Sequence, residues 1–566
     1  NKINKILLNS KNNEKKIFNK FLNELRDDLN PEITENDAVE MLAQHIITKP
    51  VFDTLFDGNN FTKENSISKA IQKTIDKIYP SKNYQDLDLL KNFYNSVKRR
   101  AQGIITSKGK TKLINELYER FFKNAFPITT QKLGIVYTPI EVVDFMIKTV
   151  QEILKEEFNK TFNDKNINIL DPFTGTGTFI TSLLQSDFLK KDNIKYKYLN
   201  EIHANEVVLL AYYIATINIE SVFHSLMKSN SYQPFGGTVL TDTFHLYEQD
   251  RDMIADLLPD NSKKRTKQKK SKITVIISNP PYSIGQKSEN DNAQNVSYPN
   301  LDEKIRSTYA KDSESVRQTA LYDSYIRSFR WASDRIEEDG IVAFITNGGW
   351  IDSKATDGFR KNLKDEFNKI FVFNLRGNAR TSRELRKKEG GNVFGEGTRT
   401  PIAITFLIKN SKIKKKGEIF YYEIGDYLNK KDKLKFIANS ENFYKFLRNK
   451  KSYQITPDKK NNWINKGSEE YDNFINLSSK SKFEKKIIFH SSSSGVFTSR
   501  DKWCYNFSKE KLIHNIKSTI SFYNDQLDKI RNKNPDINEI KKIVDNNKTK
   551  ISWSRGLFQK LQKKKK

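Results

Sequence analysis

The sequence predicts an α/β fold whose core is an open, Rossmann-like, mostly parallel sheet, preceded by a helical domain and followed by an α+β domain. Over residues 129–411, short apolar runs typical of buried parallel strands alternate with helical segments. Over residues 1–128 the apolar residues recur with helical spacing, and after residue 411 short strands, loops and helices are mixed. The chain is long enough for about three domains. We place them at 1–128, 129–411 and 412–566.

The first predicted strand, Ile167 to Leu170, runs into a turn with two glycines and then a helix. Gly175 and Gly177 allow the backbone to approach a ligand at the carboxyl end of the strand, which is the usual ligand edge of such a sheet. Asp171 adds an anionic acceptor at the same place. Because a Gly-x-Gly pair is also common in ordinary turns, this segment alone leaves a ligand site and a plain turn both open.

The second predicted strand, Tyr196 to Asn200, precedes two acids and a long apolar helix from Val207 to Ile219. An acid between a second strand and its helix is well placed to hold the two hydroxyls of a ribose. We assign this role to Glu206 rather than Glu201. The alternative for Glu206 is an ordinary acid in the first turn of a helix, favoured by the helix dipole.

The third predicted strand, Gly237 to Phe244, is short and ends in an acid and an aromatic residue, Asp242 and Phe244. Asp242 could accept a hydrogen bond from an adenine amino group while Phe244 packs near the ring. The alternative is an Asx turn at the end of a strand.

The fourth predicted strand, Ile273 to Ile277, leads into a four-residue motif: Asn279, Pro280, Pro281 and Tyr282. An aromatic exocyclic amine is a poor nucleophile because its lone pair is delocalised into the ring. The side-chain oxygen of Asn279 and the carbonyl of Pro280 can accept its two N–H groups, while proline restricts the backbone that presents them. Tyr282 can stack on the base. The motif therefore suits methyl transfer to an amino group, and the alternative is a proline turn after a strand.

Catalysis of this kind needs no strong general base, because the amine becomes acidic only as the methyl group arrives and its proton can leave to water. Preorganised acceptors carry the reaction instead. A second aromatic residue that would complete a base sandwich could be Phe373 or Phe406, although both lie in strand-like apolar runs where core packing is the better interpretation.

With a glycine turn, two acids and Asn-Pro-Pro-Tyr at successive strand ends, the chain resembles the S-adenosylmethionine-dependent N6-adenine DNA methyltransferases. The order of motifs is that of the class in which the cofactor motifs come first and target recognition last (the gamma class). This resemblance implies that Thr138 helps hold the methionine carboxylate, Glu206 the ribose and Asp242 the cofactor adenine, near Phe244. The glycine turn would lie beneath the methionine portion, with the residues Asp171, Phe173, Gly175 and Gly177. The target adenine would be flipped out of duplex DNA.

Five further segments resemble the type ISP single-polypeptide restriction-modification enzymes: Asn290–Asn292, Tyr322–Ala332, Gly340–Trp350, Asn374–Arg380 and Gly390–Pro401. In that family one chain joins a nuclease, a helicase-like motor, a methyltransferase and a target-recognition domain. No phosphate-cradling loop is present in this sequence, and Ser107 to Thr111 lacks the preceding glycine of such a loop. We therefore expect a piece of a longer polypeptide or a stand-alone relative, with nuclease and motor domains in the same chain or as a partner.

Basic residues indicate where DNA could bind. The formal net charge is +29, which suits a polyanionic partner, although a coding bias toward lysine would also raise it. Lys264 and Arg265 lie in a basic cluster before the fourth strand, and a second cluster spans Lys412 to Lys416. Arg500, in a polar loop of the C-terminal domain, is the best single candidate for a DNA contact. The alternatives are solvated loops for the clusters and a structural Arg500–Asp501 pair.

Several classes of protein are excluded or disfavoured. The single cysteine, Cys504, excludes a disulfide framework, and the six histidines lack metal-ligand spacing, so we expect no metal site. No apolar run could cross a bilayer and no signal peptide is evident, which favours a reduced cytoplasm. Three functions stay open: a DNA adenine methyltransferase of a restriction-modification system, an amino-methyltransferase acting on cytosine N4, RNA or glutamine, and a DNA-specificity scaffold for a nuclease-motor partner.

Overall fold

The computed structural model of the chain describes residues 13–31, 33–55, 61–78, 88–101, 109, 113, 138–228, 231–248, 258–281, 298–316, 318–395, 398–441, 443–450, 453–464, 470, 473–479, 486–493, 495, 498, 500–531, 535, 537–545 and 550–564. These residues form two compact units. The first extends to residue 281 and from 298 to 464, and the second begins at residue 470.

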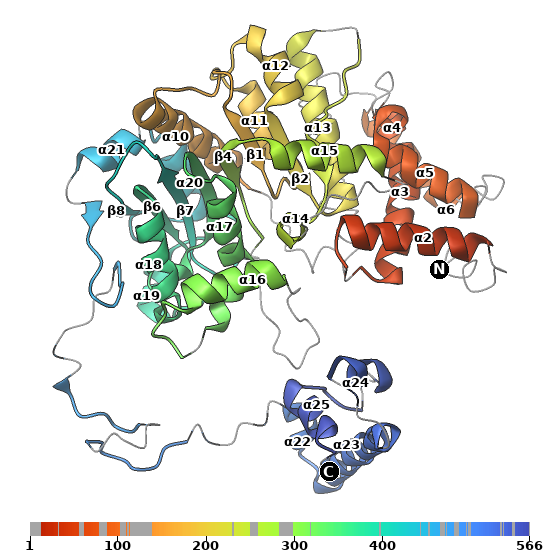
Figure 1. Cartoon of the computed structure of the whole chain (residues 1–566), viewed down its shortest axis with the longest axis vertical. Helices are drawn as coiled ribbons and strands as arrows, with labels where there is room; N and C mark the ends of the chain where they lie inside the picture. The colour runs from red at the N-terminus through yellow and green to blue at the C-terminus, as the bar shows by residue number, and fades with distance from the viewer. Residues whose placement is uncertain are drawn as a thin grey trace. The chain divides into compact units, whose positions relative to one another are not determined.

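A nine-stranded sheet with the order β3-β2-β1-β4-β5-β7-β6-β8-β9 forms the centre of the first unit (Figure 1). The strands are β1 (Asn168–Asp171), β2 (Ile202–Glu206), β3 (Thr238–Leu240), β4 (Ile273–Ser278), β5 (Gly340–Asn347), β6 (Lys369–Arg376), β7 (Ile402–Lys409), β8 (Glu418–Glu423) and β9 (Gln454–Ile455). β7 is antiparallel to β5 and β6, and β9 is antiparallel to β8, whereas the other pairs are parallel. The carboxyl ends of β1 to β6 therefore meet at one edge.

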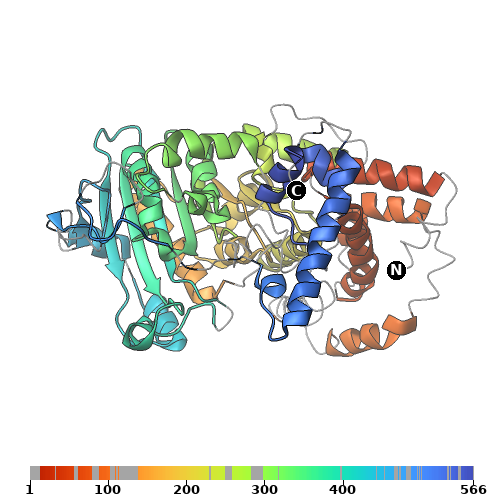
Figure 2. The same cartoon turned by 90° about the horizontal axis from the view of Figure 1, so that it is seen from below.

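The central strands are apolar along almost their whole length because helices cover both faces of the sheet. α10, α11, α13, α20 and α21 form a contiguous layer on one face of the sheet, and α16, α17 and α18 pack on the other (Figure 2). The helices are α10 (Ile140–Phe158), α11 (Thr178–Gln185), α12 (Lys191–Asn200), α13 (Leu209–Met227), α14 (His245–Glu248), α15 (Pro259–Lys270), α16 (Pro299–Ile305), α17 (Ser324–Arg335), α18 (Asp357–Glu366), α19 (Arg383–Glu389), α20 (Lys430–Ala438) and α21 (Phe443–Asn449). The predicted α/β core is thereby confirmed.

The N-terminal helices share a hydrophobic core with α13 rather than forming a separate body. They are α2 (Asn13–Asp28), α3 (Glu35–Leu55), α4 (Phe61–Glu64), α5 (Ser66–Ile78) and α6 (Asp88–Ala101). Two buried polar contacts reinforce this packing: the side chain of His45 meets the Tyr213 hydroxyl at 2.9 Å, and Asn65 Nδ2 donates to the Tyr212 hydroxyl at 3.2 Å. The helical N-terminal domain predicted from the sequence is thus present and is joined directly to the α/β core.

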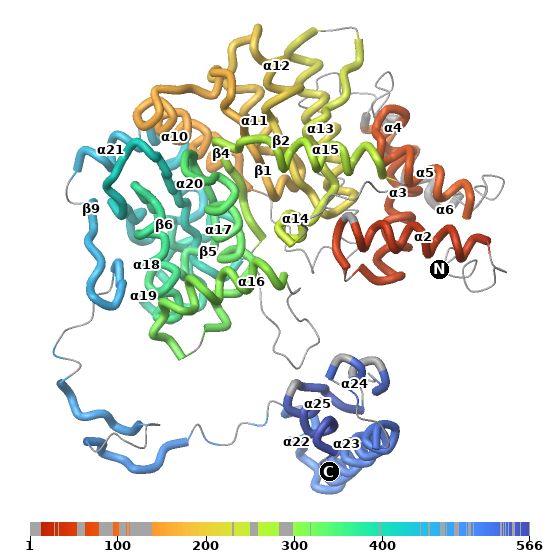
Figure 3. The backbone as a smooth tube through the Cα atoms, in the orientation of Figure 1, coloured from red at the N-terminus to blue at the C-terminus, as the bar shows by residue number. Residues whose placement is uncertain are grey.

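The second strand was predicted in the wrong segment, one that forms the helix before the actual strand. Tyr196–Asn200 is the end of helix α12, and β2 begins two residues later, at Ile202 (Figure 3). Ile194 and Tyr198, four residues apart, are both buried, and the buried side chains of Lys197 and Glu201 form an ion pair at the same spacing. These contacts select the helix, although the aromatic residues of the segment are also typical of a strand.

The boundary between the two compact units does not lie at residue 411, where the sequence analysis placed a domain boundary. β8 continues the sheet beside β6, with Val372 opposite Tyr421, and α21 packs against α10. In the second unit the described residues after 500 form helices: α22 (Asp501–Cys504), α23 (Lys509–Ile530), α24 (Ile537–Ile543) and α25 (Arg555–Gln562). Their core includes Leu527, Ile540, Trp553 and Leu561. The expected mixture of strands and helices therefore gives way to helices in this part.

No helix among the described residues is both long enough and apolar enough to span a bilayer.

Candidate functional site

The carboxyl ends of four adjacent strands bring the predicted site residues to one edge of the sheet. Asp171 ends β1 and pairs with Ala204 of β2, while Glu206 ends β2 and pairs with Leu240 of β3. Asn279 follows β4, which lies on the other side of β1. Parallel pairing therefore gathers residues that are more than a hundred positions apart in the chain.

The turn after β1 uses its two glycines differently. Both have positive φ, +57° at Gly175 and +85° at Gly177. A Cβ on Gly175 would meet nothing within 4 Å, whereas a Cβ on Gly177 would lie 3.2 Å from the Cα and carbonyl oxygen of Ala215. Gly177 thus allows α11 to pack closely on α13, and Gly175 leaves open space at the sheet edge, where a ligand can approach the backbone.

Replacing Gly177 with alanine is expected to lower the free energy of unfolding by about 2–4 kcal/mol, because the strained φ and the clash with α13 add together. The same change at Gly175 meets no neighbour and should cost about 1–2 kcal/mol from backbone strain alone. Urea denaturation of the two variants checks this difference, and equal losses would show that the packing contact is unimportant.

Asp171 is fully buried and connects the turn after β1 to the end of β4. Its Oδ1 atom accepts hydrogen bonds from the Ser278 hydroxyl at 2.6 Å and from the Phe173 backbone N–H at 3.3 Å. Its buried Oδ2 atom has no hydrogen-bond partner in the described part of the chain. Burial raises the pKa of Asp171 to about 7. Sequence analysis missed Ser278, whose only signal was its place directly before the Asn-Pro-Pro-Tyr motif.

Glu206 joins the turn after β1 to the start of α13. Its two carboxyl oxygens accept hydrogen bonds from the backbone N–H groups of Gly175 and Val208, each at 2.8 Å. Burial raises its pKa to about 7. A carboxylate oxygen can accept more than one hydrogen bond, so Glu206 keeps acceptor capacity beyond these contacts.

Asp242 forms the Asx turn that was the alternative at this position. Its Oδ1 atom accepts from the backbone N–H of Phe244 at 2.9 Å and of His245 at 3.3 Å. Its Oδ2 atom accepts from the Asn30 side-chain amide at 2.9 Å and from the Tyr298 hydroxyl at 2.8 Å. Asn30, which lies between α2 and α3, thus reaches Asp242, a contact that no sequence pattern indicated.

Aromatic rings surround this acid. The Phe244 ring lies 5.5 Å from that of Phe173 and 5.2 Å from that of Tyr298, measured between centroids. Phe173 and Phe244, both predicted site residues, are therefore neighbours, and Tyr298 joins them.

Asn279 is oriented by Thr138. The side-chain Nδ2 of Asn279 donates to the Thr138 hydroxyl at 3.0 Å, although the two residues are separated by 141 positions. Thr138 is buried directly before α10, and Pro280 is buried after β4. Because the amide nitrogen faces Thr138, the rotation of the Asn279 side chain is fixed. Pro281 is half-buried, and Tyr282, the proposed stacking residue, lies outside the described residues.

Phe373 and Phe406 are fully buried in the sheet, where both rings contact Phe145. The core-packing interpretation therefore holds for both.

The structure places two of the three predicted DNA contacts, Arg265 and Arg500, differently from an exposed phosphate-binding side chain. The basic cluster before β4 is a helix, α15, and Arg265 is only 1% exposed within it, so a phosphate contact at Arg265 is wrong for this conformation. The reason is the helical spacing, which turns Arg265 inward with Asn261 and Gln268, while Lys264 is half-buried. The Arg500 guanidinium donates to Ser554 Oγ at 2.9 Å, so its structural partner is not the Asp501 of the alternative.

Three protein-family models match the chain. A type ISP restriction-modification enzyme coupler domain matches residues 1–109, an N-6 DNA methylase domain matches residues 109–315, and a type ISP C-terminal specificity domain matches residues 487–566. No curated protein matches the chain.

Solved structures similar to the chain include three that contain DNA. A nuclease-deletion mutant of the type ISP restriction-modification enzyme LlaGI, in complex with a DNA substrate mimic, is 40% identical with a TM-score of 0.88 over 100% of this chain and 45% of its own. The ATP-dependent type ISP enzyme LlaBIII bound to DNA is 39% identical with a TM-score of 0.87, over 100% and 37%. A DrdV–DNA complex is 33% identical with a TM-score of 0.85, over 98% and 53%. The chain thus spans about half or less of the length of these relatives.

Proposed function

Because the chain corresponds to the coupler, methyltransferase and specificity portion of type ISP restriction-modification enzymes, we propose that it methylates the N6 amino group of adenine in duplex DNA. The methyl donor is S-adenosylmethionine. The observation that carries the proposal is the position of Asn279, oriented by Thr138 and one strand away from Asp171. This modification protects DNA from nuclease and motor domains in the same longer polypeptide or in a partner.

The residues at the sheet edge suit S-adenosylmethionine. The buried Oδ2 of Asp171 is without a hydrogen-bond partner among the described residues, and the space beside Gly175 is open. Glu206 keeps acceptor capacity for ribose hydroxyls, Phe173 and Phe244 offer aromatic faces for the adenine ring, and Thr138 would bind the methionine carboxylate. When bound, the cofactor supplies an electrophilic methyl group on sulfonium.

Asn279 and Pro280 activate the acceptor amine. The Asn279 side-chain oxygen and the Pro280 carbonyl accept its two N–H groups, which draws the nitrogen toward tetrahedral geometry and localises its lone pair. The Thr138 contact holds the asparagine amide in the rotamer that this requires. The proton leaves to water after transfer, so no residue needs to act as a strong base. The adenine must be rotated out of the duplex, and Tyr282 stacks on it.

We assign recognition of the DNA sequence to the C-terminal specificity segment, residues 487–566, where Arg500 is half-buried beside α25. Arg500 contributes by holding the loop that contains it against Ser554, rather than by reading a base directly. The N-terminal helices, which share a core with α13, couple the methyltransferase to further domains.

Incubation of the chain with tritiated S-adenosylmethionine and unmethylated genomic DNA tests the proposal. N6-methyladenine at a defined sequence is the expected product, identified by nucleoside chromatography and mapped by single-molecule sequencing. N4-methylcytosine, or label in RNA or protein, would contradict the adenine assignment. Sequence-specific DNA binding by a folded, cofactor-binding chain that transfers no methyl group would indicate a specificity scaffold.

Cofactor affinity is expected to fall as the pH drops below about 7. Burial raises the pKa of both Asp171 and Glu206 to about 7, so both carboxyls gain protons just below neutrality in the cofactor-free protein. A protonated carboxyl is a poorer acceptor for ribose hydroxyls, so binding is coupled to proton release and strengthens with pH until both groups are ionised. Calorimetric titrations on either side of pH 7 check this, and a constant affinity would contradict it.

A further inference from the structure

Four arginines form an exposed basic group after β6 and before β7. This group, the β6–β7 basic surface, consists of Arg380, Arg383, Arg386 and Arg399. In the described part of the chain none of the four guanidinium groups lies within ion-pairing distance of a carboxylate, whereas Lys387 on the same helix pairs with Glu384 at 3.8 Å. Unpaired, exposed arginines suit an anionic partner with planar, bidentate recognition.

Strand register places this surface at the same sheet edge as Asn279. β5 and β6 both end opposite Ile402, the first residue of β7, and the Ala379 N–H donates to the Arg399 carbonyl at 3.0 Å. β4 is the neighbour of β5, so β7 lies two strands from β4 and β6 lies three strands from it. Neighbouring strands are about 4.8 Å apart, so the surface begins about 10–14 Å along the edge from the strand of Asn279.

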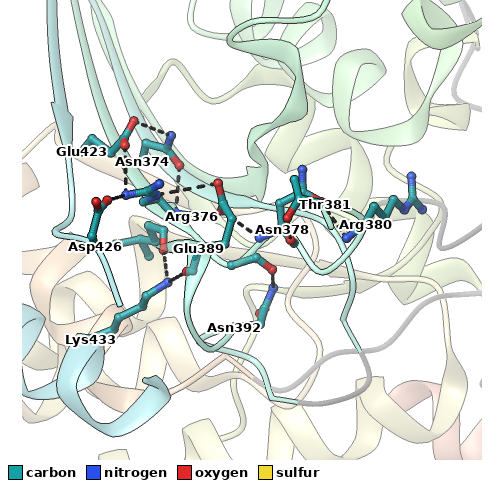
Figure 4. A network of polar contacts seen from close by, with 12 residues as sticks. Asn374, Arg376, Asn378, Arg380, Thr381, Glu389, Asn392, Glu423, Asp426 and Lys433 are labelled. Atoms are coloured by element: carbon teal, nitrogen blue, oxygen red, sulfur yellow. Dashed lines mark hydrogen bonds and ion pairs between the residues drawn. The ribbon is translucent and has the colours of Figure 1, made fainter. Parts of the chain in front are cut away.

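Arg376 holds the loop that carries this surface. Its φ is +58°, a strained value for a residue with a side chain. Its guanidinium forms ion pairs with Glu389 at 3.7 Å, with Glu423 at 3.3 Å and with Asp426, and Glu389 also accepts from the Asn378 N–H at 3.0 Å (Figure 4). Three carboxylates are therefore directed inward to Arg376, while Arg380 extends away from the network (Figure 4).

Lys433 of α20 also holds this loop in place. Its fully buried ammonium group donates to the backbone carbonyls of Leu375 and Glu389, each at 2.8 Å. The two contacts tie the end of β6 to the end of α19. The three carboxylates of Glu389, Glu423 and Asp426 are thus engaged by the internal Arg376, and none of them pairs with the outward arginines.

We propose that the β6–β7 basic surface binds the phosphates of the DNA strand beside the flipped target base. The inference rests on the proposed function and adds a second contact region within the methyltransferase unit, separate from the C-terminal specificity segment. Phosphates of one strand advance by about 3.4 Å per nucleotide along the helix axis, so a surface about 10–14 Å from the target base faces the phosphates about three to four nucleotides away. Phosphate contacts of this kind set position and affinity without reading sequence.

The other exposed basic cluster, Lys412 to Lys416, lies at the opposite edge of the sheet. β7 is antiparallel to β5, so its carboxyl end at Lys409 is at the edge away from Asn279, and this cluster follows it. Lys415 there is paired with Glu418 at 2.8 Å. The sequence offered this cluster and the one before β4 as phosphate contacts, with Lys264 and Arg265 named in the latter, whereas strand order places the cluster at Lys412 to Lys416 away from Asn279 and Arg265 is buried.

Two triple variants of the full 566-residue chain test the proposal. The first is Arg380→Gln, Arg386→Gln and Arg399→Gln, and the matched control is Lys412→Gln, Lys414→Gln and Lys416→Gln, which removes the same charge from the opposite edge. Binding to a mixed-sequence DNA duplex is measured by fluorescence anisotropy over a series of salt concentrations. Each lost phosphate contact lowers the slope of log affinity against log salt by about 0.9, so the first variant should lose about 2.7.

The control variant should keep the wild-type slope. An unchanged slope in the arginine variant, or an equal loss in the lysine control, would overturn the proposal. Because all six side chains are exposed, both proteins should fold, and matching thermal unfolding and S-adenosylmethionine binding verify this. If the wild-type chain transfers no methyl group but the arginine variant has a lower salt slope, the proposed function fails and the DNA-binding surface stands. If the wild-type chain methylates adenine but the arginine variant keeps the wild-type salt slope, the proposed function stands and the DNA-binding surface fails.

Discussion

Replacing Asn279 with alanine is expected to lower the rate of methyl transfer by about 10²–10³-fold, equivalent to about 3–4 kcal/mol of transition-state stabilisation. The variant removes one of the two proposed acceptors that localise the lone pair of the amine, an oxygen of the amide whose nitrogen Thr138 holds. Affinity for S-adenosylmethionine should fall less than the rate, because Thr138 itself is kept and the other cofactor contacts are assigned to the ends of β1, β2 and β3. Single-turnover kinetics with tritiated cofactor and calorimetry measure the two quantities separately.

The control for this variant is Asn439→Ala, which removes the same side chain from an exposed position at the end of α20. It should transfer methyl groups at the wild-type rate. If Asn279→Ala keeps more than about a tenth of the activity, Asn279 is not an essential acceptor. If it loses cofactor affinity to the same degree as rate, its role is to support the cofactor site and not to act on the amine.

Replacing Glu206 with glutamine should weaken S-adenosylmethionine binding by about 10–100-fold, the range for losing hydrogen bonds to a charged acceptor. Both carboxyl oxygens already accept backbone N–H groups, from Gly175 and Val208. Glutamine replaces one of these oxygens with an NH₂ group. This NH₂ group is a donor and cannot accept the backbone N–H group that the oxygen accepted. The turn after β1 is then no longer held to α13, and the hydroxyls of the ribose lose an anionic acceptor.

Glu220→Gln is the matched control, because Glu220 is also a buried carboxyl of the same region. It lies on α13, accepts from the Tyr232 hydroxyl at 2.7 Å and the Phe235 N–H at 2.9 Å, and burial raises its pKa to about 7. Its loss should lower stability and leave cofactor affinity and the pH dependence of binding intact. Equal losses of affinity in the two variants would mean that Glu206 acts through the fold alone.

The sequence predicted the strands best where a motif follows a short apolar run. The strands before Asp171 and Asn279 were placed to within about one residue, because each is a short apolar run closed by a polar turn, whereas the predicted third strand ran on to Phe244, past the end of β3 at Leu240. It failed at Tyr196–Asn200, where aromatic residues typical of a strand belong to a helix that a buried Lys197–Glu201 pair stabilises. Local patterns cannot distinguish these outcomes when burial comes from distant elements.

Basic residues illustrate the same limit. Lys264 and Arg265 belong to a run of charge that the sequence treats as a surface, but the helix they form turns Arg265 into the interior. The arginines after β6 have no motif of phosphate binding, and only the sheet order places them at the edge that carries Asn279. Composition gives the amount of charge, whereas tertiary packing decides which charges remain available to a partner.

The sequence by itself determined the α/β class, the order of cofactor and acceptor motifs and the chemistry that an Asn-Pro-Pro-Tyr segment can perform, because these depend on residue type and short-range spacing. The tertiary structure decided which residues meet: Thr138 with Asn279, Ser278 with Asp171, and Asn30 with Asp242. Each pair joins segments at least 107 positions apart. Their contacts arise from strand order and helix packing, which are set by burial summed over the whole unit and not by any local pattern.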